Sequence, residues 1–423
     1  WGDHCYNVKS NYTSSAFRSY DVWYANYKWI ANVNYIIDAE PEMAGTEADV
    51  AYVAGQAYAI RALCYLNLAT WFSRAPYNSL TGASRWNEPC VPVYTTGTSI
   101  DTGGQPRESL RTVYGRIDQD IDRAIELLEK ARETTLAENN KSHINLYVAL
   151  GIKSRACLAE GDWDGAFKAA KRVIDEGGYA VGTKSDLTGG MNSLDKQNVM
   201  WGAGIQVADQ AGGYAGFFTH MDNKEGAYAK SAPKLISKQL YNRISSTDIR
   251  RDWWDPSDKE SPYVSKKFSF ANVASFLGDY IYMRVEEMYF TAAEAALRLD
   301  DLKSARELMN TVMAERDPGY SANNRSGTLL GATTTTWTGS FLENILTHRR
   351  IELWGEYGRL FDVRRLGQGI DRRTDDGFSE ECISMMNRRN VNITKADTYD
   401  WVLTIPKAEL DANPNINEED QNP

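Results

Sequence analysis

Two stretches of the sequence, residues 144–177 and 286–316, follow the same helical-hairpin pattern. In each copy an apolar helix ends at a tight turn, at Gly161 in the first and at Asp301 in the second. The copies match in residue size when they are superposed: Leu158 on Leu297, Trp163 on Leu302, Ala166 on Ala305 and Val173 on Val312. Small residues at matched positions let two helices pack closely, so the pattern predicts tetratricopeptide-type hairpins. Two unrelated hairpins are the alternative, and the matched positions favour the repeat.

Further helical patterns precede these copies, at residues 16–38, 46–72 and 108–131. Thr46 and Asp49 form a capping-box signature at the start of the second pattern. The third pattern carries one apolar stripe: Leu110, Val113, Ile117, Ile121, Ala124 and Leu128. Stripes of this period indicate helices that bury one face, so we predict a mostly α fold.

Glycine, proline and scattered aromatic residues mark the remaining sequence as irregular, apart from a short strand expected near residues 198–207. A chain of 423 residues can form one elaborate domain or two. We expect one domain, with a helical scaffold at about residues 16–73, 107–176, 281–316 and 341–366. The irregular segments are then about 1–15, 74–106, 177–280, 317–340 and 367–423.

The stretch from Phe341 to Gly367 mixes charged and large apolar residues at helical spacing. The charged members lie three or four positions apart and alternate with residues such as Leu353 and Trp354: Arg349, Glu352, Glu356, Arg359, Asp362 and Arg365. Charges placed among so many apolar residues cannot all face water. The pattern favours one helix whose ionic side docks into the protein, over a surface helix with ordinary charge pairs.

Charge and cysteine content exclude several classes of protein. The net charge is −10, from 57 acidic and 47 basic residues, and no basic stripe for nucleic acid is present. No apolar run is long enough to span a bilayer. The five cysteines fit no zinc signature, and Cys64 and Cys157 lie in helical patterns typical of buried thiols. No metal or organic cofactor is predicted.

Several motifs together resemble the SusD/RagB family of Bacteroidetes surface nutrient-binding lipoproteins. The family's Arg-x-x-Glu-Leu run, followed by Glu, Arg, Asp and Arg-x-Gly, is matched from Arg349 to Gly367. The ending TIPKAELDANPNINEEDQNP resembles the family's Ile-Pro, Glu-Leu, Asn-Pro and Gln-Asn-Pro elements. The chain departs from the pattern at His348, Tyr357 and Ser73-Arg74, but the charged framework is intact.

The resemblance implies a scaffold of four tetratricopeptide-type units with irregular segments that carry the ligand site. It implies a non-catalytic protein at the outer surface of the outer membrane, which hands oligosaccharides to a SusC-like TonB-dependent transporter. A peptide-binding member of the same family is the alternative. Relatives begin with a signal peptide and a lipidated cysteine, and we expect that this anchor segment is missing here, with Cys5 not the lipid site.

A sugar offers an apolar ring face and a rim of hydroxyls, so a binder needs exposed aromatic rings and polar companions. By loop location and residue type, the predicted ligand residues are Trp1, Asp3, Tyr12, Arg18, Trp86, Tyr214, Phe217, Trp253, Trp254 and Trp337. For any one ring the alternative is that it fixes a loop onto the scaffold.

Two other functions are alternatives for a helical, aromatic-rich chain. A helical glycoside hydrolase needs two carboxylates across a cleft, and the adjacent pairs Glu286-Glu287 and Glu380-Glu381 point different ways. His348 and Glu352 could hold a metal, but a helix charge pair is the commoner reading of this spacing. A plain tetratricopeptide scaffold that binds a protein segment would carry its exposed rings along the helical groove.

Overall fold

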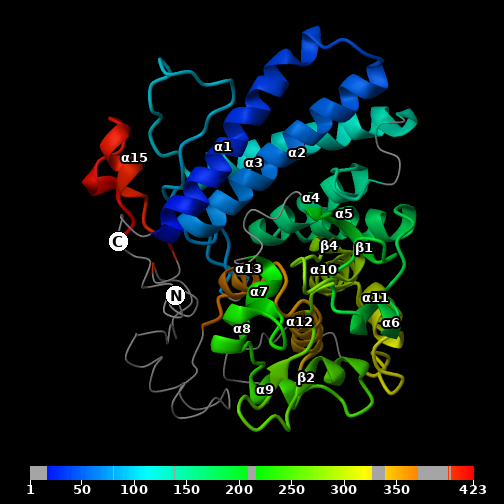
Figure 1. The fold of residues 1–423 in the computed structure, drawn as a ribbon. Helices are drawn as coiled ribbons and strands as arrows, with labels where there is room; N and C mark the ends of the chain where they lie inside the picture. The colour runs from blue at the N-terminus through cyan, green and yellow to red at the C-terminus, as the bar shows by residue number, and fades with distance from the viewer. Residues whose placement is uncertain are drawn as a thin grey trace.

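The computed structural model describes residues 17–79, 81–134, 136, 140–207, 216–325, 339–369, 399 and 402–423, with side chains described from residue 21 onward. The fold is mostly α, as the sequence predicted, with two short two-stranded sheets in these ranges (Figure 1). The long helices are α1 (Phe17–Ala39), α2 (Glu47–Phe72), α3 (Leu110–Lys130), α4 (Leu146–Glu160), α5 (Trp163–Glu176), α10 (Val285–Arg298), α11 (Leu302–Ala314) and α12 (Phe341–Glu352).

Helices α1 and α2 form a hairpin, and α3 packs along the other side of α2 (Figure 1). The cap predicted at the start of α2 is present, because the Thr46 hydroxyl accepts the Asp49 backbone N–H at 3.1 Å. Helices α2 and α3 approach closely at Gly55, where an added Cβ would lie 2.9 Å from Leu128 Cγ. Small residues on α2 therefore set the spacing of this part of the scaffold.

The two repeated hairpins, α4–α5 and α10–α11, lie side by side although a long segment separates them in sequence. Helix α5 packs against α10, and the matched alanines Ala166 and Ala305 are both fully buried. Each second helix begins on an aspartate side chain, Asp162 or Asp301, that accepts a backbone N–H. The repeat predicted from residue size is therefore a tetratricopeptide-like arrangement.

Residues 177–207 and 216–284 form a smaller layer beside these hairpins, here called the 177–284 layer (Figure 1). Its elements are α6 (Lys184–Thr188), β1 (Val199–Ala203), α7 (Phe217–Met221), α8 (Ala227–Ser231), α9 (Lys238–Tyr241), β2 (Trp254–Asp255), β3 (Val264–Ser265) and β4 (Tyr280–Arg284). Strand β1 pairs antiparallel with β4, which leads directly into α10. The layer has an aromatic core of its own, which includes Phe218, Trp253, Trp254 and Phe268.

The Phe341–Gly367 stretch is two helices rather than the single helix that the sequence suggested. Helix α12 ends at Glu352, and α13 (Arg359–Arg365) begins after a turn. Gly355 and Gly358 have φ of 75° and 117° in that turn, where a side chain would be strained. Gly355 also lies so close to Phe268 that a Cβ would be 2.5 Å from its ring. Tertiary packing therefore breaks the helix.

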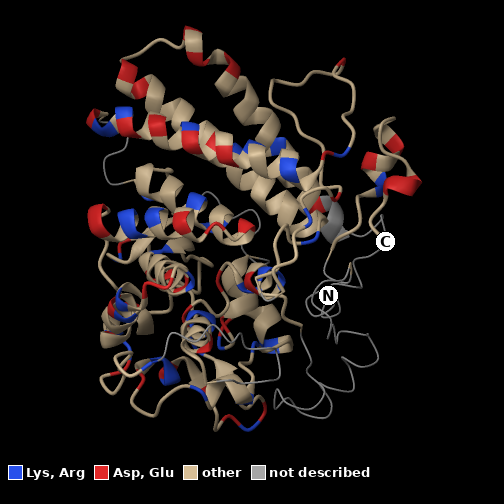
Figure 2. Cartoon of the chain, turned by 180° about the vertical axis from the view of Figure 1, so that it is seen from behind, with Lys and Arg blue, Asp and Glu red and all other residues tan. Residues whose placement is uncertain are grey.

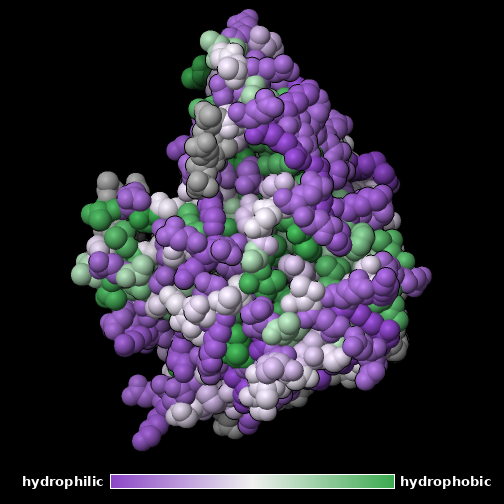
Figure 3. Space-filling model, turned by 90° about the vertical axis from the view of Figure 1, so that its right-hand side faces the viewer, coloured by the Kyte–Doolittle hydropathy of each residue, from purple (hydrophilic) through white to green (hydrophobic). Residues whose placement is uncertain are grey.

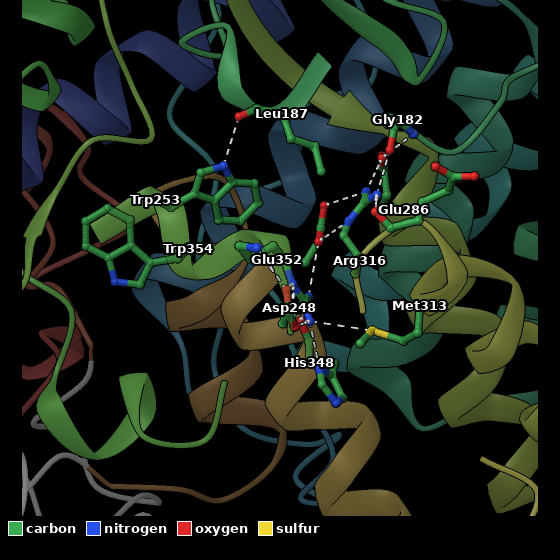
Figure 4. A network of polar contacts seen from close by, with 12 residues as sticks. Gly182, Leu187, Asp248, Trp253, Glu286, Met313, Arg316, His348, Glu352 and Trp354 are labelled. Carbon is green, nitrogen blue, oxygen red and sulfur yellow. Dashed lines mark hydrogen bonds and ion pairs between the residues drawn. The ribbon is translucent and has the colours of Figure 1, made fainter. Parts of the chain in front are cut away.

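The docked ionic side predicted for this stretch is confirmed, because Glu352 is fully buried and contacts three arginines, Arg250, Arg284 and Arg316. Figure 4 shows Glu352 beside Arg316. We call this group, with its further partners, the ionic clasp. The clasp also contains Asp248, Glu286, Glu356 and Lys267.

Neighbouring pairs complete the buried charges around α12 and α13. Arg349 pairs with Asp362 at 2.9 Å, and Arg365 pairs with Asp362 and Glu294, each at 2.8 Å. Arg349 and Glu352 are three positions apart on α12 but have different partners, since Arg349 binds Asp362 and Glu352 binds arginines from other elements. Arg359 is half-buried and donates to Gln368 rather than to Asp362.

The outer surface carries charges of both signs. Figure 2 shows basic and acidic positions interspersed along the helices. On the side drawn in Figure 3, apolar side chains form small patches between hydrophilic ones. Among the helices of the described ranges, none has both the length and the apolar character that crossing a bilayer requires.

Candidate functional site

A cavity of about 490 Å³ opens where the helical scaffold meets the 177–284 layer. We call it the junction cavity. Helices α2 and α4 supply one wall, β1, β4 and α7 another, and the turn after α12 a third. Its lining residues are Leu63, Asn67, Arg155, Met191, Trp201, Phe217, Phe268, Tyr280, Ile281, Tyr282, Gly355, Glu356 and Tyr357. This volume lies within the range of small-molecule sites.

Aromatic rings dominate the lining because of the β1–β4 pairing. Tyr280 and Tyr282 are two positions apart on β4, so they share one face of the strand. Trp201 on the partner strand packs against Tyr282, with ring centroids 5.0 Å apart and planes at 67°. Tyr282 is 40% exposed, so part of a ring face is open to a ligand. Phe217 extends the aromatic wall toward Tyr280, at 6.0 Å.

Arg155 on α4 is the buried cation of this cavity. Its Nε and Nη2 donate to both carboxylate oxygens of Glu287, at 2.9 and 2.7 Å, and Nη2 also donates to the Tyr282 carbonyl. Its guanidinium carbon lies 4.0 Å from the Tyr357 ring centroid. Burial disfavours the charged form of Arg155 and by itself would lower its pKa. The neighbouring Glu287 carboxylate outweighs burial, so the pKa of Arg155 is raised. Nη1 donates to no group in the described ranges, and the side chain of Arg155 is 2% exposed on the cavity wall.

Glu356 lies on the cavity wall but belongs to the ionic clasp. Its oxygens accept from Arg284 Nε at 2.7 Å and from Lys267 Nζ at 2.5 Å. Burial alone would raise the pKa of Glu356. Arg284 and Lys267 outweigh burial, so the pKa lies below its ordinary value and the carboxylate stays ionised. Burial also lowers the pKa of Lys267 to about 8. Each charge on the wall is thus already paired, and the cavity as a whole is close to neutral.

The predicted ligand residues have different outcomes. Phe217 lines the junction cavity. Trp253 and Trp254 are wrong as ligand platforms, because they are 2% and 1% exposed in the aromatic core of the 177–284 layer. Trp253 Nε1 donates to the Leu187 carbonyl at 2.8 Å, which fixes the ring there (Figure 4).

Trp86 packs edge-on against Tyr114, with centroids 5.7 Å apart, and does not line the junction cavity. The remaining predicted residues lie outside the described residues: Trp1, Asp3, Tyr12, Tyr214, Trp337 and the side chain of Arg18. Sequence reasoning missed Trp201, Tyr280, Tyr282 and Arg155. The alternation of tyrosines in YIYMR, just before the second hairpin, was the available signal for two of them.

Of the two adjacent carboxylate pairs in the sequence, Glu380-Glu381 lies outside the described residues. Glu286 and Glu287 are adjacent but separate, since Glu286 binds Arg316 and Glu287 binds Arg155. His348 Nδ1 lies 2.9 Å from Arg250 Nη2, and burial lowers the pKa of this imidazole well below its usual range. It therefore accepts from arginine rather than binding a metal, and the described ranges hold no group of three or more His, Cys, Asp or Glu side chains suited to a metal ion.

An aromatic cavity on a tetratricopeptide-like scaffold defines a class of small-molecule-binding proteins, and comparison with known proteins identifies the family. Residues 216–423 match the family model described as "SusD family", and residues 3–158 match "Starch-binding associating with outer membrane". The chain belongs to the SusD-like family, which is associated with carbohydrate binding at the outer membrane. A search of curated proteins found no match.

Solved structures share this fold. A SusD-like carbohydrate binding protein from Bacteroides vulgatus is 27% identical, with a TM-score of 0.75 over 94% of this chain and 83% of the other. A SusD superfamily protein from Bacteroides thetaiotaomicron is 23% identical, with a TM-score of 0.75 over 95% and 85%. Surface glycan-binding protein A from Bacteroides uniformis is 18% identical, with a TM-score of 0.65 over 95% and 84%. The second and third likenesses concern the fold alone.

Proposed function

We propose that the protein is a non-catalytic binding protein that captures a neutral oligosaccharide in the junction cavity. One observation carries the proposal: an aromatic pair, formed by Trp201 and the 40% exposed Tyr282, lies in the same cavity as Arg155, whose Nη1 has no hydrogen-bond partner within the described ranges. Ring faces bind the apolar face of a sugar, and a fixed N–H donor binds its hydroxyls. A family model described as starch-binding supports the same ligand class.

The charge balance of the cavity favours a neutral ligand. Arg155 is paired with Glu287, and Glu356 is paired with Arg284 and Lys267. A charged ligand would add an unpaired charge to this low-dielectric wall, whereas a hydroxyl-rich neutral ligand adds none. The peptide alternative requires places for charged termini and side chains, and this wall offers no uncompensated charge to receive them.

The role in uptake is a further part of the proposal. A binding protein of this family at the cell surface, held by a lipid anchor, would pass its sugar to a partner TonB-dependent transporter of SusC type. Co-purification of such a transporter with the tagged, full-length protein from outer membranes tests this part. Recovery of the binding protein alone, under conditions that preserve membrane complexes, would contradict it.

The binding site is tested by calorimetric titration with maltoheptaose and cellohexaose, comparing the parent with Trp201→Ala and Trp29→Ala. Trp29 is a matched control, because it is 57% exposed on α1 and does not line the cavity. We expect Trp201→Ala to weaken binding on the order of tenfold and Trp29→Ala to leave it unchanged. Equal affinities for all three proteins would refute the assignment, and release of shorter products from either sugar would show catalysis.

A further inference from the structure

A second cavity, of about 550 Å³, lies between α1, the loop at residues 94–105 and α15 (Lys407–Ala412). It shares no lining residue with the junction cavity. We propose that this cavity, here called the arch cavity, is a second carbohydrate-binding site. The proposal is independent of the function assigned to the junction cavity.

The loop over this cavity is fixed at its first end by α1. Asn34 Nδ2 donates to the Thr96 carbonyl at 2.9 Å, and the Gly97 N–H donates to Asp38 at 2.7 Å. Gly97 also packs on Tyr35, where a Cβ would lie 2.8 Å from the ring. This end of the loop therefore follows the surface of α1.

The other end of the loop is fixed by the segment after α15. Asn413 Nδ2 donates to the Gln105 carbonyl at 2.9 Å, and Asn415 Nδ2 donates to the Gly104 carbonyl at 2.5 Å. With both ends tied, the loop stands away from α1 as an arch (Figure 1). A loop fixed at both ends holds a preformed site at a small entropic cost to binding.

Aromatic rings line the arch cavity on the α1 side. Trp23 and Tyr27 pack with centroids 4.9 Å apart, and Tyr94 meets the edge of Tyr27 at 5.9 Å. The Tyr27 hydroxyl is fixed by donation to the Pro92 carbonyl at 2.8 Å. Tyr24 is 51% exposed one turn before Lys28, and it presents the most open ring of the group. Trp23 is only 5% exposed and belongs to the floor of the cavity, so the ring face offered to a sugar is that of Tyr24.

Polar groups face these rings from the arch. The hydroxyls of Ser99 and Thr102 each accept a backbone N–H from within the loop, at 3.2 and 2.8 Å, which leaves their O–H hydrogens for a ligand. Lys28 lies at the rim, 5.9 Å from the Tyr24 ring centroid, and forms no ion pair within the described ranges. Glu409 is occupied, because it accepts from Trp23 and Asn413.

These features distinguish the arch cavity from a packing defect. Voids in protein interiors are few and seldom exceed the size of a water molecule, whereas this cavity has the volume of a small-molecule site. Ring faces on one side and hydroxyl donors on the other match the two surfaces of a sugar ring. The ligand class is a short carbohydrate segment.

Trisaccharides test the proposal, because we expect them to be too short to fill both cavities at once. Maltotriose and cellotriose are titrated calorimetrically into the parent, Tyr24→Ala, Lys28→Gln, Trp201→Ala and the control Trp29→Ala. We expect two bound molecules for the parent, and a loss of about tenfold in affinity for one of them in Tyr24→Ala. We expect Lys28→Gln to weaken the binding of the same trisaccharide molecule and Trp29→Ala to bind both molecules as the parent does. Thermal unfolding confirms that each variant is folded.

The outcomes separate the two cavities. If Tyr24→Ala and Lys28→Gln match the parent while Trp201→Ala loses all binding, the arch cavity is not a site. If Tyr24→Ala weakens binding and Trp201→Ala does not, the arch cavity is a binding site and the junction cavity is not. A trisaccharide panel that gives no binding to the parent overturns both.

Discussion

Glu352 lies at the centre of the ionic clasp. Replacing it tests how much the clasp stabilises the contact between the scaffold and the 177–284 layer. Its side chain is fully buried and contacts Arg316 at 2.9 Å, Arg284 at 3.0 Å and Arg250 at 3.2 Å. The substitution Glu352→Gln keeps the shape and removes the charge. The arginines then remain buried with one countercharge fewer, which is expected to cost about 3–5 kcal/mol of the free energy of unfolding.

Urea unfolding at pH 7, followed by circular dichroism, measures this cost. Asp164→Asn is the control, because Asp164 and its partner Lys168 are largely exposed and such pairs contribute about 0–1 kcal/mol. A loss in Glu352→Gln no larger than in the control would refute the reasoning, since it would mean that water compensates the arginines.

The pH dependence provides a second check on Glu352. Burial raises its pKa, but Arg316, Arg284 and Arg250 outweigh burial and hold the pKa well below the ordinary value of 4.5. A carboxylate with a lowered folded-state pKa contributes stability above its unfolded pKa and loses it as the pH falls through the folded value. The difference in free energy of unfolding between the parent and Glu352→Gln should therefore be largest at neutral pH and decrease below pH 4.5. A difference that widens on acidification would contradict the assignment.

Further predictions concern the aromatic core, the buried lysine and the helix contacts. Trp253→Ala should lower the free energy of unfolding by about 3–5 kcal/mol, measured in urea, because the ring is core rather than ligand surface; a sugar-binding defect without loss of stability would contradict this. Because burial lowers the pKa of Lys267 from 10.5 to about 8, the unfolded chain binds more protons between these values. The stability of the parent should thus rise with pH in that window relative to Lys267→Met, and parallel curves would disprove it. Gly115→Ala on α3 should stabilise by about 0.5–1 kcal/mol, since its Cβ meets open space. Gly55→Ala on α2 should destabilise by about 1–3 kcal/mol, since its Cβ would lie 2.9 Å from Leu128 Cγ and 3.3 Å from Leu127 Cβ; equal melting temperatures for these two variants would refute the packing argument.

The helical scaffold could be predicted because its signals are local. Apolar stripes and matched small residues fix the hairpins, and Ala166 and Ala305 are buried as their spacing indicated. The break between α12 and α13 could not be predicted in this way, since it depends on the contact of Gly355 with Phe268, a residue distant in sequence. Local periodicity carries no information about that contact.

The junction cavity was harder to predict because its walls come from eight separate stretches of the chain. Loop aromatics were expected at the surface, but the 177–284 layer needs a core of its own and uses Trp253 and Trp254 to build it. Arg155 lies in a helix that reads as ordinary scaffold, and only the fold brings it beside Tyr282. Which rings are core and which are open depends on long-range packing.

The contact between α5 and α10 has a consequence for the order in which the chain is made. A ribosome completes α5 well before α10, because residues 177–284 must be synthesised between them. Until then, the face of α5 that α10 will cover remains open to water and to chaperones. The side chains that α5 buries, against α4 and α10 together, are mostly small: Ala166, Ala169, Ala170 and Val173. Alanine side chains expose little apolar area to water. We therefore expect the partly synthesised chain to have a low tendency to aggregate before α10 is made.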